Sequence, residues 1–458
     1  MRPVDIADVV TQTSKPRIHR KIRSRYTAKQ AEETTKTRRM RACLRCHIQR
    51  VRCIPNEENP ADPKAPCQTC LRVSQTKKVI HNCPCMRFRL PSIVLYRPGG
   101  LNLTCRWEGT QVKNVDSWAD SSTLVIDMAQ GLCRKPMTIR VRRIRPQAGD
   151  VLSRFWVHDG ECRAQELPPY ALADVHETAD QFQKYLKEYA FDLLTESVKD
   201  SDEYIRYTYS MVDIHYHSLP DELENAVTGE KIPNREKKLL ADMIRFCFSI
   251  RHTTGSSWVS GKETLGIEPN LDPSYPLGDK LSLPRMIVAQ FDSIMCEIVL
   301  KEMCPMLLKH LEEFVFKNNP ANWFTIYLVI FMLLHEISVS CRDRYRHARQ
   351  NSARTRYGTL GRFVEQMQEG ANVLLSVWQY YKSVDLMNVD WNNRNNTRLK
   401  HLTPQQVLFM QWSIQTLSQR LPTIPQTPEE GCWEHPLYFV SQMFGTWSPL
   451  RTYNYMEP

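Results

Sequence analysis

The sequence lacks the long hydrophobic run that a membrane-spanning helix needs. Its longest apolar run, WFTIYLVIFMLL at residues 323–334, has 12 residues, whereas a helix that crosses a bilayer needs about 20. His335 and Glu336 end this run, which predicts a buried core helix. The first 20 residues also lack the apolar stretch of a secretory signal. We therefore expect a soluble protein without a membrane partner.

Recognisable catalytic motifs are also missing. No GxSxG, Walker A or GxGxxG pattern occurs in the chain. His335 and Glu336 begin like the HExxH helix of a zinc protease, but Val339 stands where the second histidine is required. We therefore predict that the protein is not an enzyme.

Acidic residues are scarce at the N-terminal end. Residues 1–90 contain 21 Lys and Arg against 7 Asp and Glu, and the rest of the chain contains 40 against 43. The net charge of +11 therefore arises from one end of the chain. A basic excess of this kind is typical of a segment that binds a polyanion. Among polyanions, nucleic acid is the expected partner, ahead of a membrane surface.

Changes in residue pattern divide the chain into four parts. Residues 1–40 are basic and poor in large apolar side chains, which predicts a disordered arm for nuclear import and phosphate contact. Residues 41–89 hold a cysteine cluster. Residues 90–166 alternate apolar and polar side chains, and residues 167–458 show helical spacing. The predicted body is thus α+β, with a small antiparallel β region followed by a predominantly α-helical domain.

Particular segments carry these predictions. Strand candidates lie at residues 88–98, 121–128 and 137–144. The arginines of the last segment are expected on its solvent face. Helices are predicted around the following segments: 182–194, 239–247, 287–298, 323–334, 367–381 and 404–421.

Seven of the 15 cysteines lie between residues 43 and 85. The others are scattered singly, which is typical of free thiols in a reducing compartment. Two Cys-x2-Cys pairs predict zinc sites, because this spacing lets a tight turn offer two thiolates to one ion. Six thiolates can hold two tetrahedral ions only if two of them bridge both ions. The cluster members are Cys43, Cys46, Cys53, Cys67, Cys70, Cys83 and Cys85.

This segment resembles the fungal zinc binuclear cluster (Zn2Cys6) transcription factors. The resemblance rests on the first five of these cysteines, with Arg41 and Ala42 before the first pair and Pro66 before the second. It implies two Zn²⁺ ions per chain, bridged by Cys43 and Cys67. The sixth ligand is predicted to be Cys85, with Cys83 as its alternative.

The resemblance also implies a DNA contact by the short helix after Cys46. In that family its basic residues read a CGG-type triplet in the major groove of double-stranded DNA. An arginine can donate two hydrogen bonds to guanine, so Arg50 is the first candidate for base readout. Gln49 and Arg52 are candidates for base or phosphate contacts, and Arg45 and His47 for phosphate contacts.

The function implied is a nuclear, zinc-dependent, sequence-specific regulator of RNA polymerase II transcription. No coiled coil is visible after the cluster, so the protein is expected to bind one triplet as a monomer or to form a homodimer through the helical domain. The competing hypothesis is a one-zinc, four-cysteine scaffold that binds other proteins and not specific DNA. Segments such as LYRPG at residues 95–99 and HPLYFVSQMF at residues 435–444 are also similar to the bodies of fungal regulators.

Overall fold

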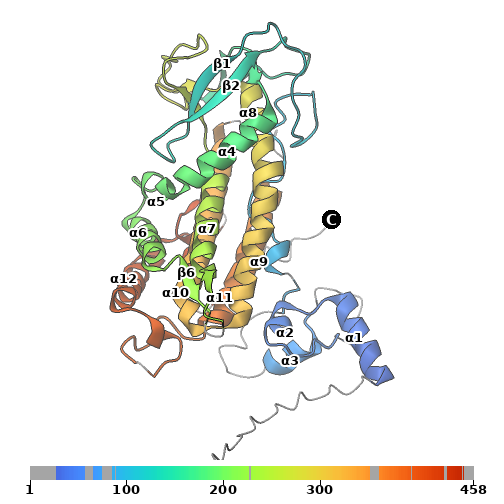
Figure 1. Cartoon of the computed structure of the whole chain (residues 1–458), viewed down its shortest axis with the longest axis vertical. Helices are drawn as coiled ribbons and strands as arrows, with labels where there is room; N and C mark the ends of the chain where they lie inside the picture. The colour runs from blue at the N-terminus through green and yellow to red at the C-terminus, as the bar shows by residue number, and fades with distance from the viewer. Residues whose placement is uncertain are drawn as a thin grey trace, which may run out of the picture.

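The computed structural model describes an α+β protein in which about half of the chain is helical. It describes residues 27–56, 65–74, 85–87, 89–225, 228–350, 360–393, 395–427, 431–445 and 447. Figure 1 shows an elongated body with a sheet at one end and long helices running toward the other. The cysteine module, meaning the described residues between 41 and 87, lies beside the end that is far from the sheet.

The main sheet is antiparallel and has the order β5-β2-β1-β8-β9. Ile126 of β1 pairs with Ile139 of β2 at its centre. Along β2 the apolar residues are buried and Arg140 is exposed, which confirms the predicted strand and its solvent-facing arginines. The strands are β1 (Leu124–Ala129), β2 (Met137–Arg143), β5 (Tyr170–Leu172), β8 (Trp258–Ser260) and β9 (Leu281–Ser282).

Two hairpins stand apart from this sheet. Strands β3 (Ser153–His158) and β4 (Glu161–Glu166) form one, and β6 (Glu222–Glu224) and β7 (Lys231–Pro233) form the other. The strand predicted at residues 88–98 is wrong, because the described part of that segment forms only the 3-10 turn η2 (Leu90–Ser92). Pro91 lies inside this turn, and proline cannot donate a backbone hydrogen bond to a sheet.

Helices form the rest of the body, and each predicted helical segment overlaps one of them. A π-helical segment (Met295–Leu300) joins α8 directly to α9, so the two helices follow one another without a break. The α-helices of the described body are α4 (Val175–Tyr189), α5 (Leu193–Glu196), α6 (Glu203–Ser218), α7 (Arg235–Arg251), α8 (Arg285–Ile294), α9 (Lys301–Lys317), α10 (Trp323–Gln350), α11 (Leu360–Lys382), α12 (Pro404–Arg420) and α13 (Tyr438–Ser441).

Helix α10 is the central helix of the body. Its first half has almost no exposed side chains, as predicted for the apolar run. By length and composition Pro320–Arg349 could cross a membrane, but the apolar window of this segment is 100% buried inside the structure. Packing against α7 and α11 is therefore sufficient to explain its apolar sequence.

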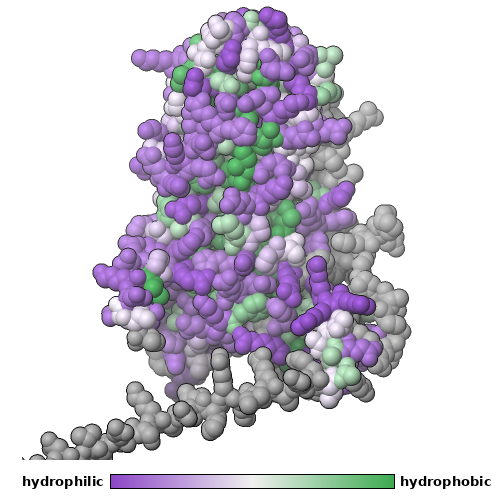
Figure 2. Space-filling model, turned by 45° about the vertical axis from the view of Figure 1, so that its right-hand side comes forward, coloured by the Kyte–Doolittle hydropathy of each residue, from purple (hydrophilic) through white to green (hydrophobic). Residues whose placement is uncertain are grey.

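One continuous hydrophobic core connects sheet and helices. It extends from Leu44 and Met86 in the cysteine module to Trp447 near the C-terminal end. Strands β5, β8 and β9 come from residues 167–458, which were predicted to be helical, and they complete the sheet. The outer surface is mostly hydrophilic on the face in Figure 2, with small hydrophobic patches between the polar side chains.

The predicted basic arm is only partly described. Residues 1–26, which hold its first cluster of cations, lie outside the described residues. Ala28–Met40 forms helix α1, although disorder was predicted for the whole arm. Its composition of Ala, Lys, Gln, Glu and Arg has high intrinsic helix propensity, which explains a helix without a large apolar face.

Candidate metal centre

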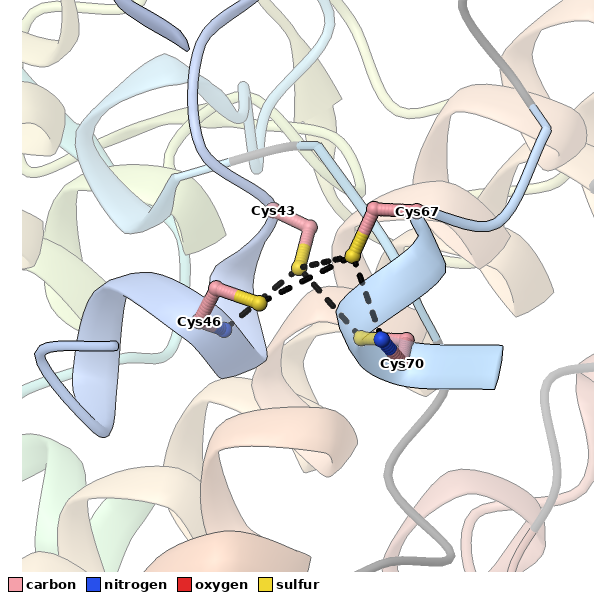
Figure 3. Close-up of side chains that lie close together, drawn as sticks. All are labelled: Cys43, Cys46, Cys67 and Cys70. Carbon is pink, nitrogen blue, oxygen red and sulfur yellow. Dashed lines mark hydrogen bonds between the residues drawn. The ribbon is translucent and has the colours of Figure 1, made fainter. Parts of the chain in front are cut away.

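Two short helices carry the paired cysteines. Helix α2 (Leu44–Ile48) follows Cys43, whose sulfur accepts the backbone N–H of Cys46 at 3.4 Å. Helix α3 (Gln68–Ser74) follows Cys67, whose sulfur accepts the N–H of Cys70 at 3.3 Å. Each Cys-x2-Cys pair therefore closes the first turn of a helix and holds its two sulfurs on the same side, as Figure 3 shows.

The four sulfurs of these pairs lie close together. All four ligand atoms are within 4.8 Å of one another. The Cys43 Sγ is 3.6 Å from the Cys70 Sγ and 3.9 Å from the Cys67 Sγ, and the Cys46 Sγ is 3.7 Å from the Cys67 Sγ. Zinc with four sulfur ligands at 2.3 Å has sulfur–sulfur distances of about 3.8 Å. The residues present therefore fit a tetrahedral metal ion.

Two further cysteines lie next to this group and occupy equivalent places. The backbone N–H of Cys43 donates to the Cys53 sulfur at 3.5 Å. The backbone N–H of Cys67 donates to the Cys85 sulfur at 3.2 Å. Cys85 belongs to the same sulfur cluster, whereas Cys83 lies outside the described residues.

The backbone around these cysteines repeats the same pattern. The N–H of Leu44, directly after Cys43, donates to the carbonyl of Met86 at 2.5 Å. The N–H of Gln68, directly after Cys67, donates to the carbonyl of Ile54 at 3.0 Å. The start of α2 is therefore hydrogen-bonded to the residue after Cys85, and the start of α3 to the residue after Cys53. The cysteine module therefore has two similar halves around one sulfur cluster, one with Cys43, Cys46 and Cys53 and the other with Cys67, Cys70 and Cys85.

The sulfurs influence one another's protonation. Hydrogen bonds with Cys43 and Cys46 lower the pKa of Cys70 to about 4 and that of Cys53 to about 7. Hydrogen bonds with Cys46 and the other cysteines raise the pKa of Cys43. The cluster therefore stabilises thiolates at some positions near neutral pH, and the thiolate is the metal-binding form.

Arg87 adds a positive charge that the sequence analysis did not single out. Its guanidinium donates to the Cys53 sulfur at 3.7 Å and to the carbonyl oxygen of Arg41 at 2.8 Å. Burial lowers the pKa of Arg87, but the hydrogen bond to Cys53 and the charges of Cys53, Cys85 and Cys43 together outweigh burial, so the pKa is raised. In the sequence, Arg87 could have been found by its position two residues after Cys85, in the segment PCMRFRL at residues 84–90.

The predicted DNA-contacting residues are in unequal positions. Arg50 and Arg52 are exposed, and Arg50 has a left-handed backbone with φ 53° at the end of α2. Gln49 is partly buried at the C-cap of that helix. Arg45 is only 3% exposed, and His47 is partly buried. The structure therefore keeps two of the five side chains at the open surface.

His47 lies against the body of the protein. Its ring meets that of Phe316 edge to face, with the centroids 4.7 Å apart. Burial, with a smaller effect of Arg89, lowers the pKa of His47, so the ring is neutral at pH 7. The Met86 sulfur also accepts a hydrogen bond from the Ser376 hydroxyl of α11 at 2.9 Å. The cysteine module is thus docked on α9 and α11.

His335 and Glu336, the pair that begins like a protease motif, lie in a buried hydrogen-bond network. Glu336 is 1% exposed and accepts hydrogen bonds from Arg251 at 2.6 and 3.0 Å and from the Tyr209 hydroxyl at 3.0 Å. The same hydroxyl lies 2.8 Å from the His335 Nδ1. These groups form a buried ion-pair network inside the body.

Comparisons with known proteins identify the body and not the cysteine module. The family model for the KpeA transcription factor matches residues 98–443, which is more than half of the chain. No curated protein and no solved structure matches the chain. The matched range begins after the last cysteine of the cluster, so the body alone carries this assignment. The chain belongs to the KpeA transcription factor family.

Proposed function

We propose that this protein is a zinc-dependent, sequence-specific DNA-binding regulator of RNA polymerase II transcription that acts in the nucleus. Membership of a transcription factor family supports DNA as the partner and argues for a regulator instead of an enzyme. The basic N-terminal end supplies the positive charge that DNA binding needs. The cysteine module is the proposed reader of a CGG-type triplet.

The two-halved arrangement of the sulfurs carries this proposal. Two tetrahedral zinc ions need eight ligand positions, which six thiolates supply when two of them bridge. Cys43 and Cys67 suit the bridging role, because each lies near sulfurs of both pairs. Cys53 and Cys85 then serve as equivalent outer ligands, as their matched backbone hydrogen bonds suggest. Zinc would hold α2 and α3 in fixed positions, and Arg87 would offset part of the negative charge of the thiolates.

The proposed DNA contacts follow from exposure. Arg50 donates to a guanine in the major groove, and Arg52 and Gln49 contact bases or phosphates. Arg45 and His47 are assigned to phosphates, but Arg45 is buried and His47 packs against Phe316 of α9. A phosphate contact by His47 therefore requires helix α2 to separate from α9. The docked structure represents the form that is not bound to DNA.

A four-cysteine, one-zinc scaffold is the competing function, and one observation favours it. The sulfurs of Cys43, Cys46, Cys67 and Cys70 alone satisfy the geometry of a single tetrahedral ion. In that case Cys53 would be dispensable for metal binding, and the module would bind the body or another protein. Metal content separates the two functions, because only the bridged cluster loses metal when Cys53 is replaced.

Oligomeric state decides how many triplets one particle reads. No coiled coil follows the cluster in the described chain, where Arg89 leads directly into the turn η2. The proposal therefore has two forms, a monomer on one triplet or a homodimer joined through the helical domain. Sedimentation of the full chain with a one-triplet and a two-triplet duplex separates them.

DNA binding by the full chain tests the proposed function. A duplex with a CGG triplet should bind more tightly than a scrambled duplex in fluorescence anisotropy. Arg50→Ala should weaken the specific complex by about 1–3 kcal/mol, as loss of a bidentate base contact does. Arg72→Ala, which removes an exposed cation from α3, is the matched control. Wild-type affinity in Arg50→Ala would contradict the base-contact assignment.

A further inference from the structure

The body contains a cavity of about 470 Å³ at the end that is distant from the cysteine module. It lies between β1, the β3–β4 hairpin, the loop after α7, helix α8 and the C-terminal part of α10. Its volume is in the range of small-molecule sites, which is about 300–1,000 Å³. Nothing in the function proposed above uses this cavity, so the inference is independent of it.

Positive charge dominates the wall of the cavity. The described lining contains five arginines and two aspartates, which gives a formal charge of +3. The two lining histidines add no charge at pH 7, because burial lowers the pKa of each to about 4. Four of the arginines also act on His347, so they surround one region of the cavity. The arginines are Arg97, Arg154, Arg285, Arg344 and Arg346.

Several of these guanidinium groups are held in place by neighbours. Arg97 pairs with Asp292, and Arg346 with Asp343. Arg154 donates to Ser256 at 3.0 Å and to Ser282 at 3.3 Å. Arg344 is 8% exposed, and its guanidinium lies 5.8 Å from the centre of the Phe363 ring. Fixed donors lose little side-chain entropy when an anion binds.

Two buried oxygen atoms indicate that the site is adapted to a polar group. The Ser340 hydroxyl and the second carboxyl oxygen of Asp292 are buried without a hydrogen-bond partner in the described part of the chain. Their residues are only 5% and 7% exposed and both line the cavity. Buried polar atoms in folded proteins are nearly always paired with protein, water or ligand. A bound hydrogen-bond acceptor would supply a partner for the Ser340 hydroxyl, which can donate its hydrogen.

Apolar side chains form part of the remaining wall. Met128, Leu283, Phe291 and Phe363 line the same space, and all four are buried. A ligand therefore meets a cluster of cations together with an apolar surface. Planar guanidinium groups bind carboxylates with paired hydrogen bonds, while Asp292 in the wall disfavours a dianion.

We propose that this cavity binds a small organic monoanion, namely a carboxylate attached to a flat apolar body. Such a ligand places its carboxylate among the arginines and its apolar body against the Phe291 and Phe363 rings. In a transcription factor, a site of this kind would act as an effector site at the end of the body opposite the cysteine module.

Two matched probes test the proposal on the full chain. Naphthalene-2-carboxylate and naphthalene-2-carboxamide have nearly the same shape but differ in charge. Isothermal titration calorimetry should show the carboxylate binding at least about tenfold more tightly than the amide, as expected for charge-assisted hydrogen bonds. Equal affinities for the two probes, or no binding of the carboxylate in the millimolar range, would overturn the proposal.

Variants place the binding in this cavity. Arg344→Met should remove the preference for the carboxylate, and Arg154→Met should do the same if the first variant does not fold. Arg140→Met is the matched control, because Arg140 is an exposed arginine on β2 outside the cavity. Unfolding temperatures confirm that each variant is folded. A carboxylate preference that survives in both cavity variants would show that the ligand binds elsewhere.

Discussion

The ring of His47, one residue after the first Cys-x2-Cys pair, packs edge to face against Phe316 with the ring centroids 4.7 Å apart. These residues are far apart in the sequence, and their contact fixes the cysteine module on the end of α9. His47, one of the residues proposed to contact DNA, is thereby turned toward the protein, whereas Arg50 and Arg52 stay exposed. This contact leads to the first prediction.

Phe316→Ala should increase the affinity of the full chain for CGG-containing DNA. Removing the ring weakens the docked form by about 0.5–1.5 kcal/mol, the usual value of an aromatic pair. The gain in affinity should therefore reach up to about tenfold. Fluorescence anisotropy measures it, and Met306→Ala, an exposed uncharged position on the same helix, is the control. Unchanged or weaker binding in Phe316→Ala would show that docking does not compete with DNA.

Arg87→Met should weaken metal retention without removing a ligand. The guanidinium donates hydrogen bonds to the Cys53 sulfur and to the carbonyl oxygen of Arg41. Loss of such an outer contact typically costs about 10- to 100-fold in metal affinity. Competition with a chromogenic chelator measures the change, and Arg72→Met, an exposed arginine on α3, is the control. Equal metal release from the two variants would show that Arg87 does not contribute to metal retention.

Glu336→Gln should destabilise the body by about 3–5 kcal/mol, because it leaves the buried Arg251 guanidinium without its charged partner. The urea midpoint of unfolding measures the loss. The control is Glu313→Gln, which breaks an exposed pair with Arg235 and should cost less than about 1 kcal/mol. Similar losses in the two variants would show that burial does not matter for this ion pair.

His215 should make the folded state sensitive to acid. Burial lowers its pKa to about 4. Thr325 and Gln406 lie within hydrogen-bond distance of the two ring nitrogens. The unfolded chain has a pKa near 6.5, so it binds the proton more strongly than the folded chain between pH 6.5 and 4. The stabilising contribution is therefore complete above pH 6.5 and is lost as the pH falls toward 4.

The size of this effect follows from the difference between the two pKa values. Relative to His215→Gln, the wild type should lose up to about 3 kcal/mol of unfolding free energy between pH 7 and pH 4. Chemical denaturation at a series of pH values measures this difference. His217→Gln is the control, because His217 is exposed two residues away. A wild-type curve parallel to that of His215→Gln would contradict the assignment.

Local sequence patterns were sufficient for much of the fold. The strands at residues 121–128 and 137–144 could be predicted from their alternating pattern, and the core helix α10 from its continuous apolar run. The cysteine pairs were equally local, since a Cys-x2-Cys turn needs no distant partner. The wrong strand at residues 88–98 came from an alternating pattern that Pro91 interrupts.

Contacts between distant segments could not be predicted. The position of Phe316 against His47 depends on where α9 ends relative to the cysteine module. Burial of Arg45 could not be predicted either, because a basic residue is expected at the surface unless the tertiary structure covers it. The cavity arginines also come from separate parts of the chain, and only folding brings them together.

The zinc content of the full chain is the most direct test of the bridged cluster that the proposed function depends on. Native mass spectrometry should show two zinc ions per chain, and removal of both by a chelator should abolish binding to the CGG duplex. Cys53→Ala should reduce the zinc content. One ion per chain that is unaffected by Cys53→Ala, or full DNA affinity after complete chelation, would contradict the account.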